Sequence, residues 1–528
     1  MWRDEMNSAI TVKRMISNKN GILMLVFCLG VTVRMYFFPI GLPVSLDGID
    51  YFSFAYSLSE NGEFPKGILG TNDGWAILLG ALFKIVNTHD FQILQFIQRF
   101  ASVIISSVTV FPVYYICKKF SDNKCALLGA SIFIFDFRII ENSILGITEP
   151  LFIFLSTCSI IFGLRRDRFI YISFILVGLA SIVRYEALLL GIPISIIVCK
   201  NKELQNKKIK ILIGISLLVL TLLPIYYLRT QVNGYDGIVT HIIAGPQYIL
   251  SNTNNVSSES INIISDQINK ISDFVLNSAF NTSKFLIWDM IPIYIIFVPA
   301  GLYYAIRKNH ESLMIWVVFA ATMIIPGLYA YGRGIEETRY IYILFPIFCA
   351  IASFFILESR INSYKKILLT VFGIFVVSIF ALQLHATDYT YDKEIYEVTK
   401  KLVPIAEATN DYPGSKYMKV ATLNIQWPKQ LPTDESGTTI YSLRRIPTAS
   451  YDSLTKYILD SKSMGLTHIV VTENNKSRFL DELLRDYQEY PFLIKEFDSK
   501  ENGYKNRIII FKIDYNKISP EKMIFGSK

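Results

Sequence analysis

The sequence has few residues that could hold a metal ion or build a disulfide framework. It contains six cysteines and five histidines among 528 residues. The cysteines all lie within or at the ends of apolar runs, none of them in the polar C-terminal region: Cys28, Cys117, Cys125, Cys158, Cys199 and Cys349. The histidines show no metal-ligand spacing: His89, His241, His310, His385 and His468. Neither a disulfide framework nor a zinc site is therefore expected.

Charged residues are also scarce. They make up 18% of the chain, whereas 52% is hydrophobic and the mean hydropathy is +0.37. The apolar residues come in long runs, which is typical of a polytopic membrane protein in contact with membrane lipids. The net charge of +8 could indicate a nucleic-acid partner, but the basic residues cluster in short loops between apolar runs. We therefore interpret the charge as membrane topology and expect no nucleic-acid partner.

The apolar runs have the length of membrane spans, since a hydrocarbon core about 30 Å thick needs roughly 20 apolar residues per helix. Eleven spans are predicted, near residues 21–40, 98–117, 125–140, 148–164, 169–184, 187–199, 211–228, 285–306, 312–331, 340–357 and 367–384. The first run lacks a small-residue cleavage site, so we treat it as a permanent helix. The predicted fold class is mainly α, a polytopic membrane helix bundle of about eleven spans with a C-terminal extracytoplasmic α/β domain.

Basic residues predict the orientation of this bundle. The N-terminal segment holds Arg3, Lys13, Arg14 and Lys19. Every second loop after it is basic, and these five loops begin at Lys118, Arg165, Lys200, Arg307 and Ser359. The positive-inside rule places them and the N-terminus in the cytoplasm, which leaves the C-terminus outside. We expect a multi-pass protein of the cell membrane.

The opposite side carries much more chain. The predicted transmembrane domain, residues 1–384, has long external loops at 41–97 and 229–284, and residues 385–528 form a polar extracytoplasmic domain. An enzyme working at the outer leaflet needs such surfaces, whereas a channel or simple carrier rarely does. The asymmetry favours an enzyme.

The C-terminal domain alternates period-2 and helical patterns. Strands are predicted from Tyr417, from Thr467 and on both sides of a turn at Asn502 and Gly503. Helices are predicted from Asp452, ending at Gly465, and from Ser477. No Gly-rich phosphate loop follows a strand, so we interpret the domain as accessory or acceptor-facing and without chemistry of its own.

The segment "LDGIDYFSFAYSL" from Leu46 follows the first span directly. It resembles the first external loop of the GT-C class of membrane glycosyltransferases, in particular the dolichyl-phosphate-mannose-protein mannosyltransferase-like branch of archaea and bacteria. An acidic residue at this place is the catalytic base in that family. The resemblance implies this role for Asp47, with Asp50 as the second candidate. The residues alone leave an alternative, because Asp47 could simply cap the helix that begins near Gly48.

Four further segments extend the resemblance over most of the first 385 residues. They are "NDGWAILLGALFKI" from Asn72, "DFRIIENSILGITEPLF" from Asp136, "SIVRYEALLLGIP" from Ser181 and "ETRYIYILFPI" from Glu337. The chain departs from the family pattern at three places: Trp75 and Ala76 replace a proline after Gly74, Tyr185 stands where Pro is usual, and Ala187 where Gly is usual. The ordered set of five segments, each at the outer membrane face, carries the resemblance.

Ionisable side chains also gather on this outer side, where they are costly unless paired or functional. They are Asp136, Arg138, Glu141, Glu149, Arg184, Glu186, Glu336, Glu337 and Arg339. We expect them to line one external cavity.

Sugar transfer from a lipid phosphate needs a base for the acceptor proton, cations for the leaving phosphate and a groove for the lipid. The resemblance implies a polyprenyl- or dolichyl-phosphate-linked sugar as donor and a protein, lipid or glycan as acceptor. Asp47 is the predicted catalytic base, and Arg138, Arg184 and Arg339, or Arg333, are predicted to hold phosphate. The other predicted substrate-binding residues are Asp50, Tyr51, Asp136, Glu149 and Glu186.

Structural roles remain open for several of these residues. Arg184 and Glu186 could form an ion pair at a helix turn, Arg339 could be an interfacial anchor, and Glu149 could favour the start of a helix. Asp47, Asp136 and Glu149 could together bind Mg²⁺ or Mn²⁺, or could bind sugar hydroxyls and arginines instead. We predict no metal and no other cofactor.

Two rival functions remain. An oligosaccharyltransferase would carry a Trp-Trp-Asp motif in its external domain, where this chain has a single tryptophan, Trp427. A lipid or polysaccharide transporter or flippase would show internal repeats or broken helices in corresponding halves, and no such symmetry is visible. Both are therefore disfavoured.

Overall fold

The computed structural model of the protein describes residues 19–44, 47–66, 72–165, 169–200, 204–240, 262–308, 313–358, 364–385, 389–426, 443–473, 475 and 477–518. Several residues named above lie outside these ranges: Arg3, Lys13, Arg14, Leu46, residues 201–203 of the loop that begins at Lys200, His241, His310, Ser359 and Trp427.

The chain divides into two compact units. The first comprises Met1–Phe38, Phe54–Asn87 and Phe96–Ala386, and the second comprises Pro39–Ser53, Thr88–Gln95 and Thr387–Lys528. The second unit therefore joins the start of the first predicted external loop to the C-terminal part of the chain. The predicted domain boundary at residue 385 stays a prediction.

The first unit is a helix bundle. The helices up to Lys200 are α2 (Lys19–Tyr36), α3 (Asp47–Asn61), α4 (Gly74–Val86), α5 (Phe91–Val108), α6 (Val110–Phe120), α7 (Asn123–Ile134), α8 (Phe137–Ser143), α9 (Glu149–Gly163), α10 (Ile170–Val183), η1 (Tyr185–Leu190) and α11 (Gly191–Lys200). The following helices are α12 (Lys207–Asn233), α14 (Asn262–Met290), α15 (Tyr294–Arg307), α16 (Leu313–Met323), α17 (Ile325–Gly332), η2 (Thr338–Leu344), α18 (Phe345–Glu358) and α19 (Tyr364–His385). The starts of α3 and α5 belong to the second unit.

Each of the eleven predicted apolar segments lies on one or more of these helices. Among the described residues, five helices are long and apolar enough to cross a membrane, or up to six if the pair α14 and α15, bent by 103°, is one span. The five are Phe91–Phe120, Lys207–Asn233, Leu313–Gly332, Thr338–Phe355 and Lys365–His385. Shorter apolar helices account for more of the predicted segments. The chain is a multi-pass membrane protein, and eleven crossings stay a prediction.

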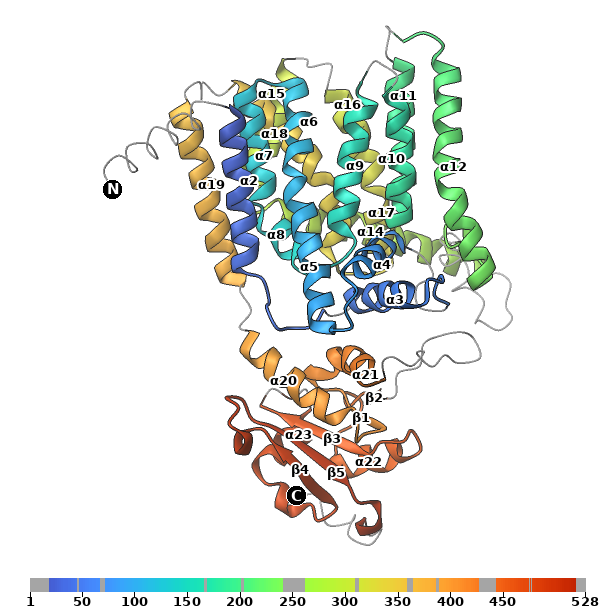
Figure 1. Ribbon diagram of the computed structural model, residues 1–528, viewed down its shortest axis with the longest axis vertical. Helices are drawn as coiled ribbons and strands as arrows, with labels where there is room; N and C mark the ends of the chain where they lie inside the picture. Colours follow the sequence, from blue (N-terminus) through green and yellow to red (C-terminus); the bar gives the residue numbers. More distant parts are fainter. Residues whose placement is uncertain are drawn as a thin grey trace. The chain divides into compact units, whose positions relative to one another are not determined.

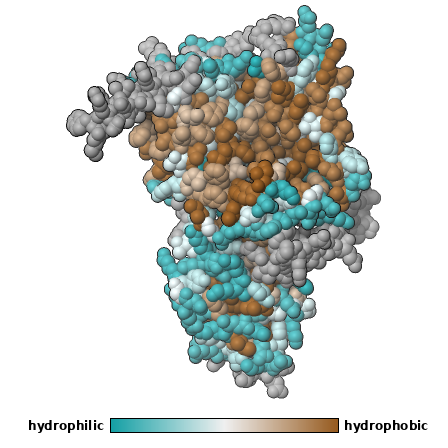
Figure 2. Space-filling model, in the orientation of Figure 1, coloured by the Kyte–Doolittle hydropathy of each residue, from teal (hydrophilic) through white to brown (hydrophobic). Residues whose placement is uncertain are grey.

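Figure 1 shows the long helices of this unit side by side, with α2 next to α19. Apolar side chains cover the visible face of these helices in Figure 2, as expected for a surface that contacts lipid. Close packing depends on small residues: a Cβ added at Gly301 of α15 would lie 2.1 Å from the carbonyl oxygen of Ile351 on α18. Small residues at such crossings let helix backbones approach each other.

The second unit contains a five-stranded mixed sheet of strand order β2-β1-β3-β5-β4. The strands are β1 (Ala408–Asn410), β2 (Arg444–Ile446), β3 (His468–Thr472), β4 (Leu493–Asp498) and β5 (Ile508–Ile513). β1 is parallel to β2 and β3, whereas β5 is antiparallel to β3 and β4. The helical segments are α20 (Tyr389–Leu402), η3 (Pro413–Tyr417), α21 (Met418–Gln426), α22 (Leu454–Lys462), α23 (Arg478–Arg485), η4 (Tyr487–Glu489), η5 (Lys500–Asn502) and η6 (Tyr515–Lys517).

Most sequence predictions for this unit are confirmed. The predicted strand from Thr467 is β3, the predicted turn joins β4 and β5, and the two predicted helices are α22 and α23. The strand predicted from Tyr417 is wrong, because this segment forms the end of η3 and then α21. Its apolar residues Met418, Val420 and Leu423 are buried in the helical form, and α21 packs on α20 and η3. Tertiary packing here overrides the strand preference of the β-branched residues.

Candidate functional site

A cluster of arginines and carboxylates lies where helices of the first unit begin and end. We call it the Arg184 cluster, and its members are Glu149, Arg184, Glu186, Glu337 and Arg339. Glu149 begins α9, Arg184 lies between α10 and η1, and Arg339 lies at the start of η2. The structure thus brings four predicted site residues together with Glu337, although the five are spread over 190 positions of the sequence.

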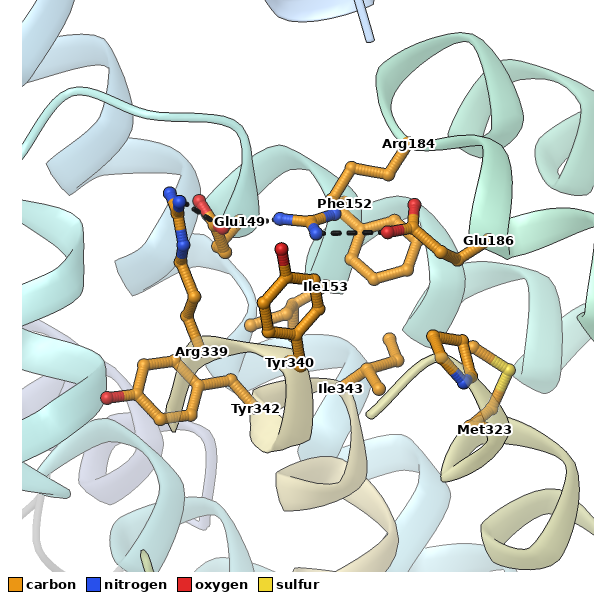
Figure 3. Close-up of a pocket in the computed structure, with 11 residues that line it drawn as sticks. Glu149, Phe152, Ile153, Arg184, Glu186, Met323, Arg339, Tyr340, Tyr342 and Ile343 are labelled. Carbon is orange, nitrogen blue, oxygen red and sulfur yellow. Dashed lines mark hydrogen bonds and ion pairs between the residues drawn. The ribbon is translucent and has the colours of Figure 1, made fainter. Parts of the chain in front are cut away.

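Arg184 lies between two carboxylates of this cluster (Figure 3). Its Nη1 is 2.5 Å from Oε1 of Glu149, and its Nη2 is 3.0 Å from Oε1 of Glu186. All three side chains are buried. Thr148 donates a hydrogen bond of 3.3 Å to the second oxygen of Glu149. The ion pair left open as an alternative for Arg184 and Glu186 is present, and Glu149 extends it into a buried triad.

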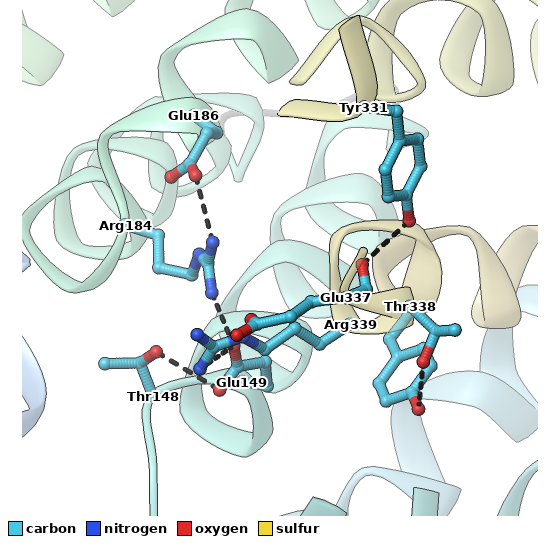
Figure 4. A network of polar contacts seen from close by, with 9 residues as sticks. Thr148, Glu149, Arg184, Glu186, Tyr331, Glu337, Thr338 and Arg339 are labelled. Atoms are coloured by element: carbon cyan, nitrogen blue, oxygen red, sulfur yellow. Dashed lines mark hydrogen bonds and ion pairs between the residues drawn. The ribbon is translucent and has the colours of Figure 1, made fainter. Parts of the chain in front are cut away.

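Arg339 approaches Glu149 from the other side. Its Nη1 lies 3.7 Å from Oε1 of Glu149, and its Nε pairs with Oε2 of Glu337. The Glu337 side chain is 50% exposed and that of Arg339 is 23% exposed. Figure 4 shows the resulting chain of contacts, in which Tyr331 also donates a hydrogen bond to the carbonyl oxygen of Glu337. Arg339 therefore connects the buried triad to a side chain that water can reach.

A small pocket opens beside this cluster; the space between its lining residues, open solvent included, is about 320 Å³. Its polar lining comes from Glu149, Arg184, Glu186 and Arg339. The rest of the lining is mainly aromatic and aliphatic: Phe152, Ile153, Met323, Pro326, Tyr340, Tyr342 and Ile343. The guanidinium carbon of Arg184 lies 5.4 Å from the centre of the Tyr340 ring. A few charged groups in an apolar wall are typical of a pocket that orients a ligand by its polar end.

The segment 72–75 holds the turn that carries Arg184. Asn72, at a positive φ of 60°, accepts a hydrogen bond from the backbone N–H of Tyr185. A Cβ added at Gly74 would lie 2.8 Å from the backbone nitrogen of Val183, so only glycine fits there. Trp75 donates from its indole nitrogen to the carbonyl oxygen of Gly146, in the loop before α9. One short segment thus positions both Arg184 and the start of α9.

Asp73 in the same segment forms an ion pair that the sequence analysis missed. Arg229, near the end of α12, donates from Nε to Asp73 at 2.9 Å and from Nη2 to its other oxygen. Both side chains are fully buried. The sequence did contain a signal for this pair, because a lone arginine at the end of an apolar run needs a partner at membrane depth.

Arg138 has a different environment from Arg184. Its Nη1 and Nη2 each donate, at 2.5 Å, to the carbonyl oxygens of Ile291 and Trp288, and its Nε lies 3.0 Å from Asp289. These contacts, which we call the Arg138 clamp, hold the end of α14 at the break before α15. The last carbonyls of a helix lack partners within the helix, and a cation there also complements the helix dipole. Arg138 does not line the pocket, so the structure separates it from Arg184 and Arg339.

Asp136 and Glu141 lie on either side of Arg138 in the sequence. Asp136 caps α8 by accepting hydrogen bonds from the backbone N–H groups of Arg138 and Ile139. These hydrogen bonds supply partners to a carboxylate that is buried. Burial raises the pKa of Glu141 to about 7; Arg138 opposes this shift and Asp136 adds to it. Neither acid lines the pocket.

Asp47, Asp50 and Tyr51 lie in the first turns of α3, within the second unit. Asp50 Oδ1 is 3.1 Å from the ammonium nitrogen of Lys419 on α21. Burial raises the pKa of the Asp50 carboxyl and Asp47 adds to this, while Lys419 opposes it. Tyr51 is buried. α3 begins at Asp47, so the alternative role of this residue at the helix start stays open.

A metal site is not apparent in the part of the chain that the structure describes, where no three His, Cys, Asp or Glu side chains are grouped closely enough to hold an ion. Asp136 and Glu149 have protein partners instead, the N-terminus of α8 and Arg184. Metal dependence stays untested.

Comparison with solved structures gives likenesses over most of the chain. ArnT from Cupriavidus metallidurans, bound to undecaprenyl phosphate, matches with a TM-score of 0.54 at 10% identity, over 93% of this chain and 98% of that one. The Archaeoglobus fulgidus oligosaccharyltransferase, in complex with zinc and sulfate, matches with a TM-score of 0.52 at 12% identity, over 85% and 67%. The chain has the fold of these membrane proteins. No family model and no curated protein matches the sequence.

The archaeal oligosaccharyltransferase AglB with an inhibitory peptide and a dolichol-phosphate also matches, with a TM-score of 0.52 at 10% identity, over 85% of this chain and 69% of that one. These neighbours are GT-C glycosyltransferases, so the predicted GT-C resemblance is confirmed for the fold. Membership of the mannosyltransferase-like branch stays a prediction.

Proposed function

We propose that the protein transfers a sugar from a polyprenyl-phosphate-linked donor to an acceptor at the extracytoplasmic face of the membrane. The observation that carries this proposal is the Arg184 cluster, in which Arg184 and Arg339 line a largely apolar pocket at the ends of membrane helices. The pocket lies in a fold shared with ArnT bound to undecaprenyl phosphate and with AglB bound to a dolichol-phosphate. A charged phosphate on an apolar chain fits a pocket of this composition.

The two arginines have different tasks in this proposal. Arg184 is buried between Glu149 and Glu186 and fixes the shape of the pocket. Arg339 is the more accessible cation, and its partner Glu337 is half exposed. A donor phosphate can replace Glu337 beside Arg339 and form a bidentate contact with its guanidinium.

Asp47 is the proposed base, a role that rests on the sequence resemblance. It takes the proton of the acceptor hydroxyl, whose oxygen then forms a bond to the anomeric carbon of the sugar. The bond from that carbon to the donor phosphate breaks, and the electron pair leaves with the phosphate. Arginines beside the phosphate stabilise the charge that builds up on it.

The finer assignments rest on the same resemblance. We propose a hexose such as mannose as the sugar and a protein, lipid or glycan as the acceptor, and the acceptor peptide tethered to the Archaeoglobus fulgidus oligosaccharyltransferase supports a protein acceptor. The N-terminus is proposed to be cytoplasmic and the C-terminal unit extracytoplasmic. Single cysteines at the exposed Lys208 and Glu336, in a chain without the exposed Cys28 and Cys199, test this orientation. Only the cysteine at 336 should react with impermeant reagents in intact cells.

The direct test is to incubate the purified protein with a labelled polyprenyl-phosphate sugar. Transfer to an acceptor, or hydrolysis of the donor, supports an enzyme, whereas translocation alone would establish a carrier. Asp47→Asn keeps the shape and capping ability of the side chain but removes its proton-accepting charge. We expect transfer to fall about 100-fold or more, with thermal stability close to wild type. Asp50→Asn should do less, and unchanged turnover in the Asp47 variant would remove Asp47 as the base.

A further inference from the structure

The C-terminal part of the chain reaches the acidic helix start in the second unit. Lys419 of α21 lies 3.1 Å from Asp50 of α3, although the two residues are separated by 369 positions in the sequence. Residues 39–53 belong to the same compact unit as residues 387–528. A domain interpreted from its sequence as without chemistry therefore contributes a charged side chain to the segment that carries the proposed base.

This contact acts on a pair of carboxylates that repel each other. Asp47 and Asp50 are three residues apart in the first turn of α3, on neighbouring positions of the helix surface. Partial burial removes water from Asp50, whose side chain is 33% exposed. Both effects favour its protonated form, and an ammonium at 3.1 Å favours the ionised form.

We propose that Lys419 is a positioning residue for the reaction. It fixes the Asp50 carboxylate beside Asp47 and offsets the repulsion between the two, so that Asp50 keeps its charge when the acceptor binds. This inference rests on the proposed function, because it assumes that the acidic turn of α3 takes part in transfer. It assigns the C-terminal unit a part in the chemistry through Asp50, not through contact with substrate.

A neighbouring ion pair supplies a matched control. Lys416 of η3 lies 2.7 Å from Asp392 of α20, so it is a lysine–aspartate pair three residues before Lys419 in the same unit. Its side chain is 40% exposed, close to the 44% of Lys419. The charged groups that act on Asp50 are Lys419 from α21 and Asp47 from its own helix, whereas Lys416 pairs within the C-terminal segment.

The test measures kcat/KM against pH for wild type, Lys419→Gln, Lys419→Arg and Lys416→Gln. Loss of the ammonium raises the pKa of the Asp50 carboxyl, so the acid limb of the Lys419→Gln profile should move to higher pH by about one unit or more. Activity should recover in alkaline buffer, which a loss of folded protein would not allow. Lys419→Arg keeps the charge and should restore the wild-type limb, and Lys416→Gln should leave it in place.

The inference is overturned if the acid limb of kcat/KM in Lys419→Gln lies at the same pH as in wild type. It is also overturned if Lys419→Arg shows the same shift as Lys419→Gln. A second measurement does not depend on transfer. Cysteines replacing Asp50 and Lys419, in a chain without Cys28 and Cys199, should be joined by a short bifunctional thiol reagent, and their failure to react would overturn the contact. If the crosslink forms but wild type transfers nothing, the proposed function fails and the role of Lys419 in it falls as well.

Discussion

Arg138 and Arg184 are both buried arginines at helix ends of the first unit, and both were predicted to hold phosphate. The Arg138 guanidinium donates to two backbone carbonyl oxygens and pairs with Asp289. The Arg184 guanidinium instead pairs with the side chains of Glu149 and Glu186 on the wall of a pocket. Burial and charge are therefore the same at the two places, and the kind of partner differs.

From this difference we propose a structural role for Arg138 and a ligand-binding role for the Arg184 cluster. Backbone carbonyls at a helix end cannot move away without unfolding that end. The Arg138 guanidinium therefore stays bound to them and does not turn toward a ligand. Carboxylate side chains can change rotamer when a phosphate arrives, most readily the half-exposed Glu337. The comparison predicts that substitutions in the Arg138 clamp lower stability, whereas those in the Arg184 cluster change affinity for the donor with little effect on stability.

The largest effect is expected from Arg138→Gln. The variant leaves Asp289 buried without a cation and removes donors from the carbonyls of Trp288 and Ile291, so the free energy of unfolding should fall by about 3–5 kcal/mol. Thermal unfolding in detergent measures it. The control is Arg339→Gln, whose partially exposed pairs should change stability by less than about 1 kcal/mol. Equal losses in the two variants would contradict the distinction.

Glu141, beside the clamp, should make stability depend on pH. Its pKa in the folded protein is about 7, above the ordinary value of 4.5, because burial disfavours the charged form. The folded state therefore binds more protons between these values, and stability should fall as pH rises from about 4.5 through 7, by at most about 3 kcal/mol. Glu141→Gln should flatten this decline in a series of melts at different pH.

Glu394 in the second unit should make stability depend on pH in the opposite direction, and it serves as a control. It accepts hydrogen bonds from the backbone N–H groups of Lys505 and Asn506, which lower the pKa of its carboxyl. Its contribution should be present above the ordinary carboxyl pKa and be lost as pH falls through the lowered value. A decline with rising pH that persists in Glu141→Gln would assign the effect to another group.

The sequence predicted the members of the Arg184 cluster only within a larger set expected to line one cavity, and Asp136, Arg138 and Glu141 of that set do not line this pocket. Glu149, Arg184, Glu186 and Arg339 are ionisable residues next to apolar runs on one predicted side of the membrane, and such residues need partners. The partners of Arg138 could not be predicted, because two of them are backbone atoms and the third, Asp289, lies 151 positions away in the sequence. The contact of Asp50 with Lys419 was hidden for another reason, since the segment that carries Lys419 was predicted as a strand and forms a helix.

Arg184→Lys separates charge from shape within the Arg184 cluster. Lysine keeps the positive charge between Glu149 and Glu186 but lacks the planar fork that bridges two carboxylates at once. Glu149 and Glu186 should then be held less firmly at the pocket wall. We expect the KM for the donor to rise about tenfold, which corresponds to about 1.4 kcal/mol. An unchanged donor KM would show that donor binding does not need the planar guanidinium of Arg184.

The smallest effect, and the one of opposite sign, is expected from Glu337→Gln. Glu337 pairs with Arg339 at the accessible side of the cluster, and in the proposed function the donor phosphate takes its place there. Glutamine removes the competing negative charge but keeps the size of the side chain, so the donor should bind about two- to threefold more tightly, a change of about 0.5 kcal/mol that is usual for an exposed ion pair. Donor titration of the purified variant measures it. Because Glu149 remains beside Arg339 at 3.7 Å, the cation keeps a partner and the fold should be unaffected. Weaker donor binding in this variant would mean that Glu337 holds Arg339 in place for the phosphate, and that the pair stays intact when the donor binds.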